Sequence, residues 1–158
     1  MTNLTVLSDN ETSVSVNGAH VSEMTNEDVR LLLIQDQNML HLPRNLHELF
    51  PNVEGLIIDN SSLTAISKVD LLNFPKLKLL FIGRNKIEKI ESDLFEASPG
   101  IQRLGFTNNF TKKIGSGILN PLKMLKFADF DRNSCIAMKA LNKNAIENLK
   151  LEIERKCQ

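Results

Sequence analysis

The stretch LKLLFIGRNKIEKI, residues 77–90, decides the fold of this chain. Its apolar residues stand at offsets 0, 3, 5, 10 and 13 from Leu77, and Asn85 stands at offset 8. This spacing fits neither the 3.6-residue period of a helix nor the strict alternation of a strand. The stretch also holds two large apolar residues that the spacing does not need, Leu79 and Phe81, and they require a separate explanation.

The same pattern recurs every 24 residues without an insertion, in units that begin at Val29, Val53, Leu77, Ile101 and Leu125. A fixed period between 20 and 29 residues with the pattern L-x-x-L-x-L-x-x-N-x-L is the sequence signature of leucine-rich repeats. The chain resembles the extracellular, 24-residue class of these proteins, such as Slit and Toll-like ectodomains, and is similar to short secreted insect leucine-rich-repeat proteins. The resemblance implies a non-enzymatic binding module that acts in recognition or innate immunity.

The spacing, together with this resemblance, predicts an α/β solenoid in the form of a right-handed superhelix. Offsets 3 and 5 point inward on a short strand, and neighbouring repeats stack these strands into a parallel sheet on the concave face. Short helical turns are expected on the convex face, with Ser67 and Ser92 as their N-caps. The chain then divides into an N-terminal cap (1–28), five repeats (29–138) and a C-terminal capping helix (139–158), all within one domain.

Offset 8 requires a side chain that both donates and accepts hydrogen bonds, because the turning backbone leaves amide groups unpaired in the interior. A ladder of asparagines fits this requirement: Asn85, Asn109 and Asn133. Ser61 and Gln37 stand at the same offset in the first two repeats, so the first repeat should be the least regular. Behind the sheet, an apolar spine is expected from Phe50, Phe74, Phe95 and Leu122.

Solenoids need caps at both ends, because the terminal repeats otherwise expose their core. The alternating segments NLTVLS and SVSVNG before Val29 predict a pair of strands over the first repeat. After Met138, the spacing places one apolar face on a helix: Leu141, Ala145, Leu149 and Ile153.

The two cysteines, Cys135 and Cys157, allow two interpretations. Cys135 can be a buried thiol that is unrelated to the thiol near the C-terminus. Alternatively, the two form a disulfide that holds the C-terminal cap, which the resemblance to extracellular family members favours.

Bulk properties exclude several classes of function. The formal net charge is zero, which argues against a nucleic-acid partner or an anionic membrane surface. No apolar run reaches the length of a membrane span. The sequence shows no catalytic motif and no glycine-rich phosphate loop, and two cysteines without a nearby histidine do not suggest a metal site, so no cofactor and no metal are expected.

The location of the protein is less constrained by the sequence. The first residues lack the features of a signal peptide, which leaves a cytosolic protein or a mature or truncated secreted one. Four sequons occur, and burial of a ladder residue should exclude Asn109, so the glycosylation candidates are Asn3, Asn10 and Asn60. These signals together favour an extracellular protein, with a cytosolic adaptor as the alternative.

Offsets 2, 4 and 6 point away from the core, onto the concave sheet surface. They place Leu79 and Phe81 beside other apolar residues on neighbouring strands, followed by a more polar region. The expected partner-binding residues are Leu31, Leu33, Ile57, Asp59, Leu79, Phe81, Arg103, Phe127, Asp129 and Asp131. Adjacent exposed apolar residues usually mark an interaction surface, which predicts a protein ligand here. The alternatives are coverage by the N-terminal segment and homodimerisation through the same face.

Overall fold

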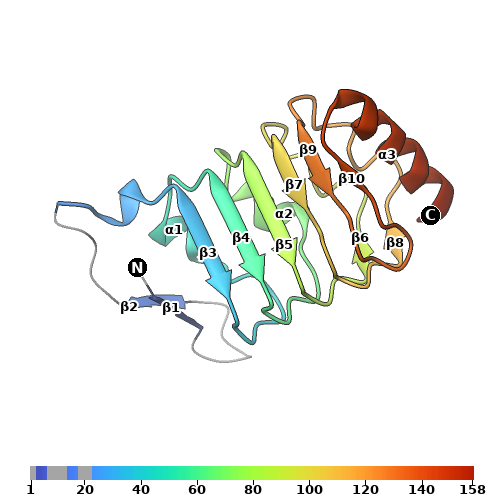
Figure 1. Cartoon of the computed structure of the whole chain (residues 1–158). Coiled ribbons are helices and arrows are strands. Elements are labelled where there is room, and N and C mark those ends of the chain that lie inside the picture. The colour runs from blue at the N-terminus through green and yellow to red at the C-terminus, as the bar shows by residue number, and fades with distance from the viewer. Residues whose placement is uncertain (1–2, 7–13, 18–22) are drawn as a thin grey trace.

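The computed structural model describes residues 3–6, 14–17 and 23–158, the first two segments as backbone strands only. A six-stranded sheet runs along one side of the molecule (Figure 1). In spatial order its strands are β3 (Leu31–Gln35), β4 (Gly55–Asp59), β5 (Leu79–Gly83), β7 (Arg103–Gly105), β9 (Phe127–Asp129) and β10 (Lys139–Ala140). The first five are parallel, whereas β10 is antiparallel to β9.

The strand register follows the repeat. Leu31 pairs with Gly55, Gly55 with Leu79, Leu79 with Arg103 and Arg103 with Phe127, so each partner lies 24 positions further along. The predicted solenoid with a parallel sheet is confirmed. Because the register has no slip, every offset of the repeat keeps the same orientation from strand to strand.

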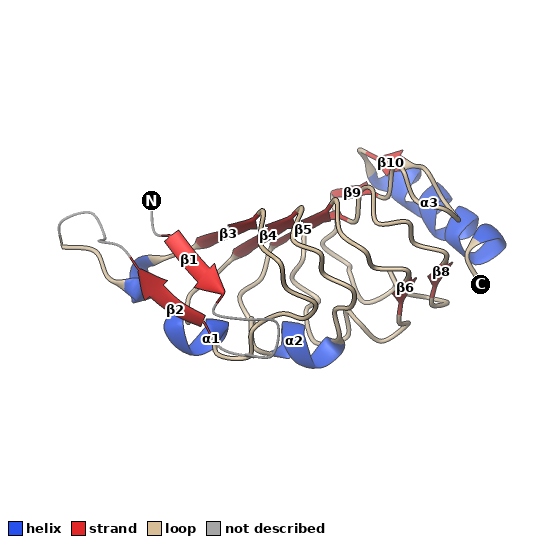
Figure 2. Ribbon diagram, turned by 90° about the horizontal axis from the view of Figure 1, so that it is seen from below, coloured by secondary structure: helices blue, strands red, loops and turns tan. Residues whose placement is uncertain are grey.

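Two short helices lie on the side opposite the sheet (Figure 2). They are α1 (Leu46–Leu49) and α2 (Lys68–Leu72). At the start of α2 the Ser67 hydroxyl accepts a hydrogen bond from the Asp70 N–H, and the Asp70 carboxylate accepts one from the Ser67 N–H. This reciprocal capping confirms the predicted N-cap.

The predicted helical turn after Ser92 is wrong, because residues 92–97 form a series of turns instead. Leu94 and Phe95 are adjacent and both are fully buried, whereas α2 buries only Leu71. The irregular turns allow both side chains to enter the core. Two further short strands, β6 (Lys89–Ile90) and β8 (Lys113–Ile114), pair in parallel and form a separate two-stranded sheet.

The core lies between the sheet and the return segments. The inward strand positions at offsets 3 and 5 are almost completely buried, and so is the spine behind them, which comprises Phe50, Phe74, Phe95 and Leu122. Phe95 meets Phe106 edge to face at 6.2 Å between ring centroids, and Phe106 stacks on Phe130 at 5.8 Å. These aromatic contacts join the third repeat to the fifth.

Asparagine side chains bridge consecutive repeats within the core. Asn85 Oδ1 accepts hydrogen bonds from the N–H groups of Ser61 (2.9 Å) and Leu63 (3.1 Å). Its Nδ2 donates to the carbonyl oxygens of Ile58 (2.9 Å) and Gly83 (2.8 Å). Asn109 and Asn133 make equivalent bonds one and two repeats further on.

The ladder weakens towards the first repeat. The Ser61 hydroxyl accepts from the Gln37 N–H at 3.3 Å and donates to the Asp59 carbonyl at 2.9 Å. Gln37 itself turns its amide to the Gln35 carbonyl at 3.0 Å rather than into an adjacent repeat. The Gln37 side chain therefore does not continue the asparagine ladder.

At the N-terminal end, β1 (Asn3–Val6) and β2 (Val14–Asn17) form an antiparallel pair in a sheet of their own, followed by a 3-10 turn, η1 (Asn26–Asp28). The expected strand pair is thus present, and it does not extend the main sheet. Whether it functions as a cap stays a prediction.

At the C-terminal end, α3 (Lys143–Lys156) packs against the last repeat, and Asn142 is its N-cap, with a side chain that accepts a hydrogen bond from the Ala145 N–H. The predicted apolar face needs correction. Leu141 precedes the helix and is 68% exposed, and Ala145 is only partly buried. The buried face consists of Ile146, Leu149 and Ile153.

A disulfide joins Cys135 to Cys157, with 5.1 Å between their Cα atoms. Cys157 is the C-cap of α3 and is fully buried, whereas Cys135 lies in the fifth repeat and is partly buried. The Cys157 carbonyl also accepts a hydrogen bond from the Ile114 N–H. The disulfide therefore fixes the end of α3 to the solenoid.

Candidate binding face

The outward side chains of β3 to β9 form an apolar strip across the concave sheet surface, here called the concave strip. Its members are Leu31, Leu33, Ile57, Leu79, Phe81 and Phe127. Leu31 and Leu33 are 56% and 53% exposed, and the other four are partly exposed. The face of an open sheet that meets water normally carries polar residues. The strip therefore is the feature of this surface that needs a functional explanation.

Two glycines allow the side chains of the strip to lie close to the sheet. A Cβ atom on Gly55 would come within 2.7 Å of Leu31 Cδ1 and 3.6 Å of Leu79 Cδ2. A Cβ atom on Gly105 would overlap the ring of Phe81. Phe81 thus leans from β5 over β7, and the strip is continuous rather than a set of separate side chains.

An aromatic and cationic cluster ends the strip. The rings of Phe81 and Phe127 meet edge to face, with 5.9 Å between their centroids. The guanidinium group of Arg103 lies 5.0 Å from the centre of the Phe127 ring, a cation–π distance. Phenylalanine and arginine are both enriched at protein interfaces relative to the rest of the surface.

The Asp59 carboxylate forms a bidentate ion pair with Arg84, whose Nε lies 2.9 Å from Asp59 Oδ1. This hydrogen bond to Asp59 raises the pKa of the Arg84 guanidinium. Arg84 is not among the binding residues predicted from the sequence. Its position 25 residues after Asp59 places it diagonally across one repeat, and the repeat register could have indicated the pair.

The structure places Asp129 differently from the expectation of an open carboxylate. Asp129 is 9% exposed, its Oδ1 accepts from the Asp131 N–H at 2.9 Å, and its Oδ2 lies 3.1 Å from Lys139 Nζ. The cause is the antiparallel β10, which sets Lys139 directly opposite Asp129. Asp131 is half-buried and lies 3.8 Å from the Arg132 side chain. Of the predicted polar binding residues in this region, Arg103 and Asp131 are more accessible to a partner than Asp129 is.

The sequons fall in different surroundings. Asn109 is fully buried, whereas Asn60 is exposed and its Nδ2 donates to Asp36 Oδ1 at 2.6 Å. Asn3 is the first residue of β1, and Asn10 is outside the described residues. Glycosylation at Asn3, Asn10 and Asn60 stays a prediction.

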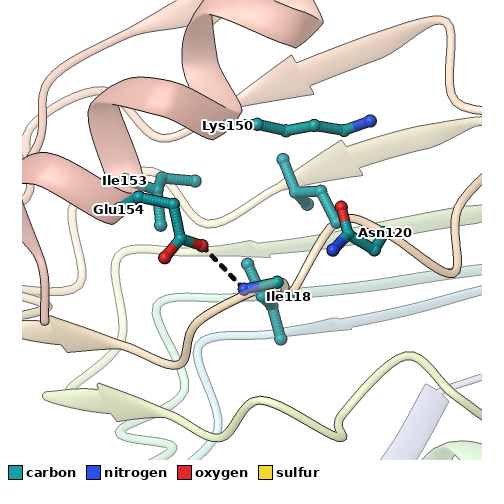
Figure 3. A pocket seen from close by; sticks show the side chains of 7 residues that line it. Ile118, Asn120, Lys150, Ile153 and Glu154 are labelled. Carbon is teal, nitrogen blue, oxygen red and sulfur yellow. Dashed lines mark hydrogen bonds between the residues drawn. The ribbon is translucent and has the colours of Figure 1, made fainter.

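Beside the concave strip, the described residues offer little support for a small-molecule site, a metal site or a membrane span. Figure 3 shows a small hollow between α3 and the fourth repeat, where Glu154 accepts hydrogen bonds from the N–H of Gly117 at 2.7 Å and from Ser116 at 2.8 Å. Its volume of ≈ 10 Å³ holds about one water molecule. Within residues 23–158 and the two described strands, no cluster of three metal-ligating side chains is found. None of the described helices is long and apolar enough to cross a membrane.

Comparison with known proteins agrees with this architecture. Residues 51–110 match the model of a family described as leucine rich repeat. The chain is also similar to a chain in the solved structure of the Toll–Spatzle complex, described as a molecular hub in Drosophila development and innate immunity. That match has a TM-score of 0.63 and 18% identity, and it covers 73% of this chain but 16% of the Toll-complex chain. The likeness shows the fold, a leucine-rich-repeat solenoid, and residues 51–110 contain the repeats that the family model matches.

Proposed function

We propose that the concave strip binds a protein ligand, and that this binding is the function of the molecule. The observation that carries the proposal is the continuity of Leu31, Leu33, Ile57, Leu79 and Phe81 across three neighbouring strands. Burying such a strip against a partner removes apolar surface from water at about 25 cal/mol per Å². The strip ends on Arg103 and Phe127, which add directional contacts.

The proposed setting is outside the cell, in recognition of the kind found in innate immunity. A disulfide between Cys135 and Cys157 supports this location, because disulfides persist in oxidising compartments. The likeness to a chain of the Toll–Spatzle complex supports a protein ligand rather than a small molecule. A cytosolic adaptor would instead keep both thiols reduced, and mass measurement of the native protein without reductant distinguishes these cases.

Affinity capture from the native fluid tests the proposal. The bait is the wild-type chain, compared with Phe81→Asp and Ile57→Asp, which place a charge in the strip without touching the buried core. Leu151→Asp serves as the control, because Leu151 is 68% exposed on α3, away from the strip. The proposal requires a protein held by wild type and by the control but lost with both strip variants. A protein retained equally by all four baits would refute it.

A further inference from the structure

The main sheet ends at β3, and within the described residues no strand pairs with the outer edge of β3. The neighbouring β1–β2 pair forms a separate sheet. An open edge presents a row of backbone N–H and C=O groups that can pair with another chain. Natural sheets usually protect such an edge with a charged residue, a proline or a bulge, and LLLIQ of β3 contains no charged residue or proline.

The register identifies which backbone groups point outward. The Arg30 carbonyl accepts from the Gly55 N–H, and the Asp36 N–H donates to the Asp59 carbonyl, so the even-numbered residues face β4. Backbone groups alternate along a strand, and those of Leu31, Leu33 and Gln35 therefore point to the open edge. The Gln35 carbonyl accepts from the Gln37 side chain, and its second lone pair leaves room for another donor.

We propose that two copies of this chain associate by antiparallel pairing of β3 with β3 about a two-fold axis at Leu33. In this register Leu33 pairs with Leu33 of the other copy, and Leu31 pairs with Gln35. The outward backbone groups of these residues are those that form hydrogen-bonded pairs in an antiparallel ladder. The two concave strips then join, and their two most exposed members, Leu31 and Leu33, pack across the axis.

Charge complementarity supports a second copy as the partner. The residues that flank β3 are Arg30 and Asp36, and the proposed register sets Arg30 of each copy opposite Asp36 of the other. Both residues are exposed; Arg30 hydrogen-bonds the Glu27 carbonyl and Asp36 the Asn60 side chain. Opposite charges directly across an antiparallel pair are stabilising, and like charges are destabilising.

Cysteine cross-linking tests the register with a matched control. Leu33→Cys places two thiols on the axis, where a hydrogen-bonded pair has a Cα–Cα distance of about 5.5 Å, within the range of a disulfide. Leu31→Cys is equally exposed, but its two copies are about 14 Å apart along the strand and cannot bond. Under mild oxidation the first variant should give a covalent dimer and the second should not. Equal cross-linking of both, or of neither, overturns the proposal.

Sedimentation equilibrium tests the strength of the association. Arg30→Asp should raise the dimer dissociation constant roughly tenfold, because two attractive contacts become repulsive. Adding Asp36→Arg should restore the dissociation constant of the wild-type dimer. Position 36 accommodates arginine, because Arg84 and Arg132 occupy the same offset with positive φ.

Leu33→Pro removes an outward N–H together with the Leu33 side chain at the axis, leaves the hydrogen bonds to β4 in place, and should abolish the dimer while the monomer stays folded by circular dichroism. A chain that stays monomeric at all concentrations overturns the proposal. So does a dimer that is lost with Phe81→Asp but retained with Leu33→Pro, because that result moves self-association to the concave strip. A monomeric chain leaves capture of a different protein by the strip unaffected, whereas self-association through the strip would compete with that capture.

Discussion

Removal of the Asn85 side chain tests how the solenoid is held together. Asn85 is 2% exposed and forms four hydrogen bonds to backbone groups of its own repeat and the preceding one. Asn85→Ala leaves those groups without partners in the interior. With about 1 kcal/mol for each bond, the free energy of unfolding should fall by roughly 4 kcal/mol. For a chain of this length the melting temperature should fall by roughly 10 °C.

Urea denaturation followed by circular dichroism measures this loss, provided that the m-value does not change. Asn85→Ser is the graded control, because Ser61 occupies the same offset and there donates one hydrogen bond and accepts one. It should lose about half as much, roughly 2 kcal/mol. The reasoning fails if Asn85→Ala is within 0.5 kcal/mol of wild type, or if the serine variant is the less stable of the two.

Three further perturbations probe the C-terminal part of the chain. Replacing Cys135 and Cys157 by alanine opens a link across 22 residues and should lower the free energy of unfolding by about 3 kcal/mol, measured by urea denaturation against the oxidised wild type. Arg132 has φ of 55°, a conformation that asparagine tolerates better than arginine does. Arg132→Asn should therefore raise the free energy of unfolding by roughly 0.5–1 kcal/mol, and with it the melting temperature. Hydrogen bonds from Arg155 and Lys156 lower the pKa of Glu152 to about 2. The stabilising contribution of the Glu152 carboxylate is therefore present above the usual carboxyl range and lost as the pH falls towards 2. Glu152→Gln should flatten that part of the acid-denaturation profile, and an unchanged profile would contradict the assignment.

Much of the fold could be predicted from the sequence because the repeat is regular. A spacing kept over five units fixes the strand register, the inward positions and the asparagine ladder together. The short helix after Ser67 was predicted from a local signal, a serine suited to the N-cap, and the structure adds the reciprocal hydrogen bond with Asp70. These features depend on short-range patterns, which a single sequence contains.

The parts that could not be predicted depend on contacts between distant residues. The segment after Ser92 forms turns because two adjacent side chains, Leu94 and Phe95, must both be buried. Asp129 is covered because β10 folds back antiparallel beside β9, a strand of two residues that the repeat does not encode. The predicted apolar face of α3 was partly wrong because Leu141 lies before the N-cap Asn142, outside the helix, and the buried face includes Ile146 instead.

The central claim, that the concave strip binds a protein, depends on Phe81 more than on any other residue. The direct measurement is a titration of the captured protein against the wild-type chain, Phe81→Asp and the surface control Leu151→Asp. We expect Phe81 to be a hot spot of the interface, where truncation costs about 2 kcal/mol or more and a charge costs further, so Phe81→Asp should weaken binding by about 100-fold or more. The control should bind as wild type does. Equal affinities of all three chains would contradict the account.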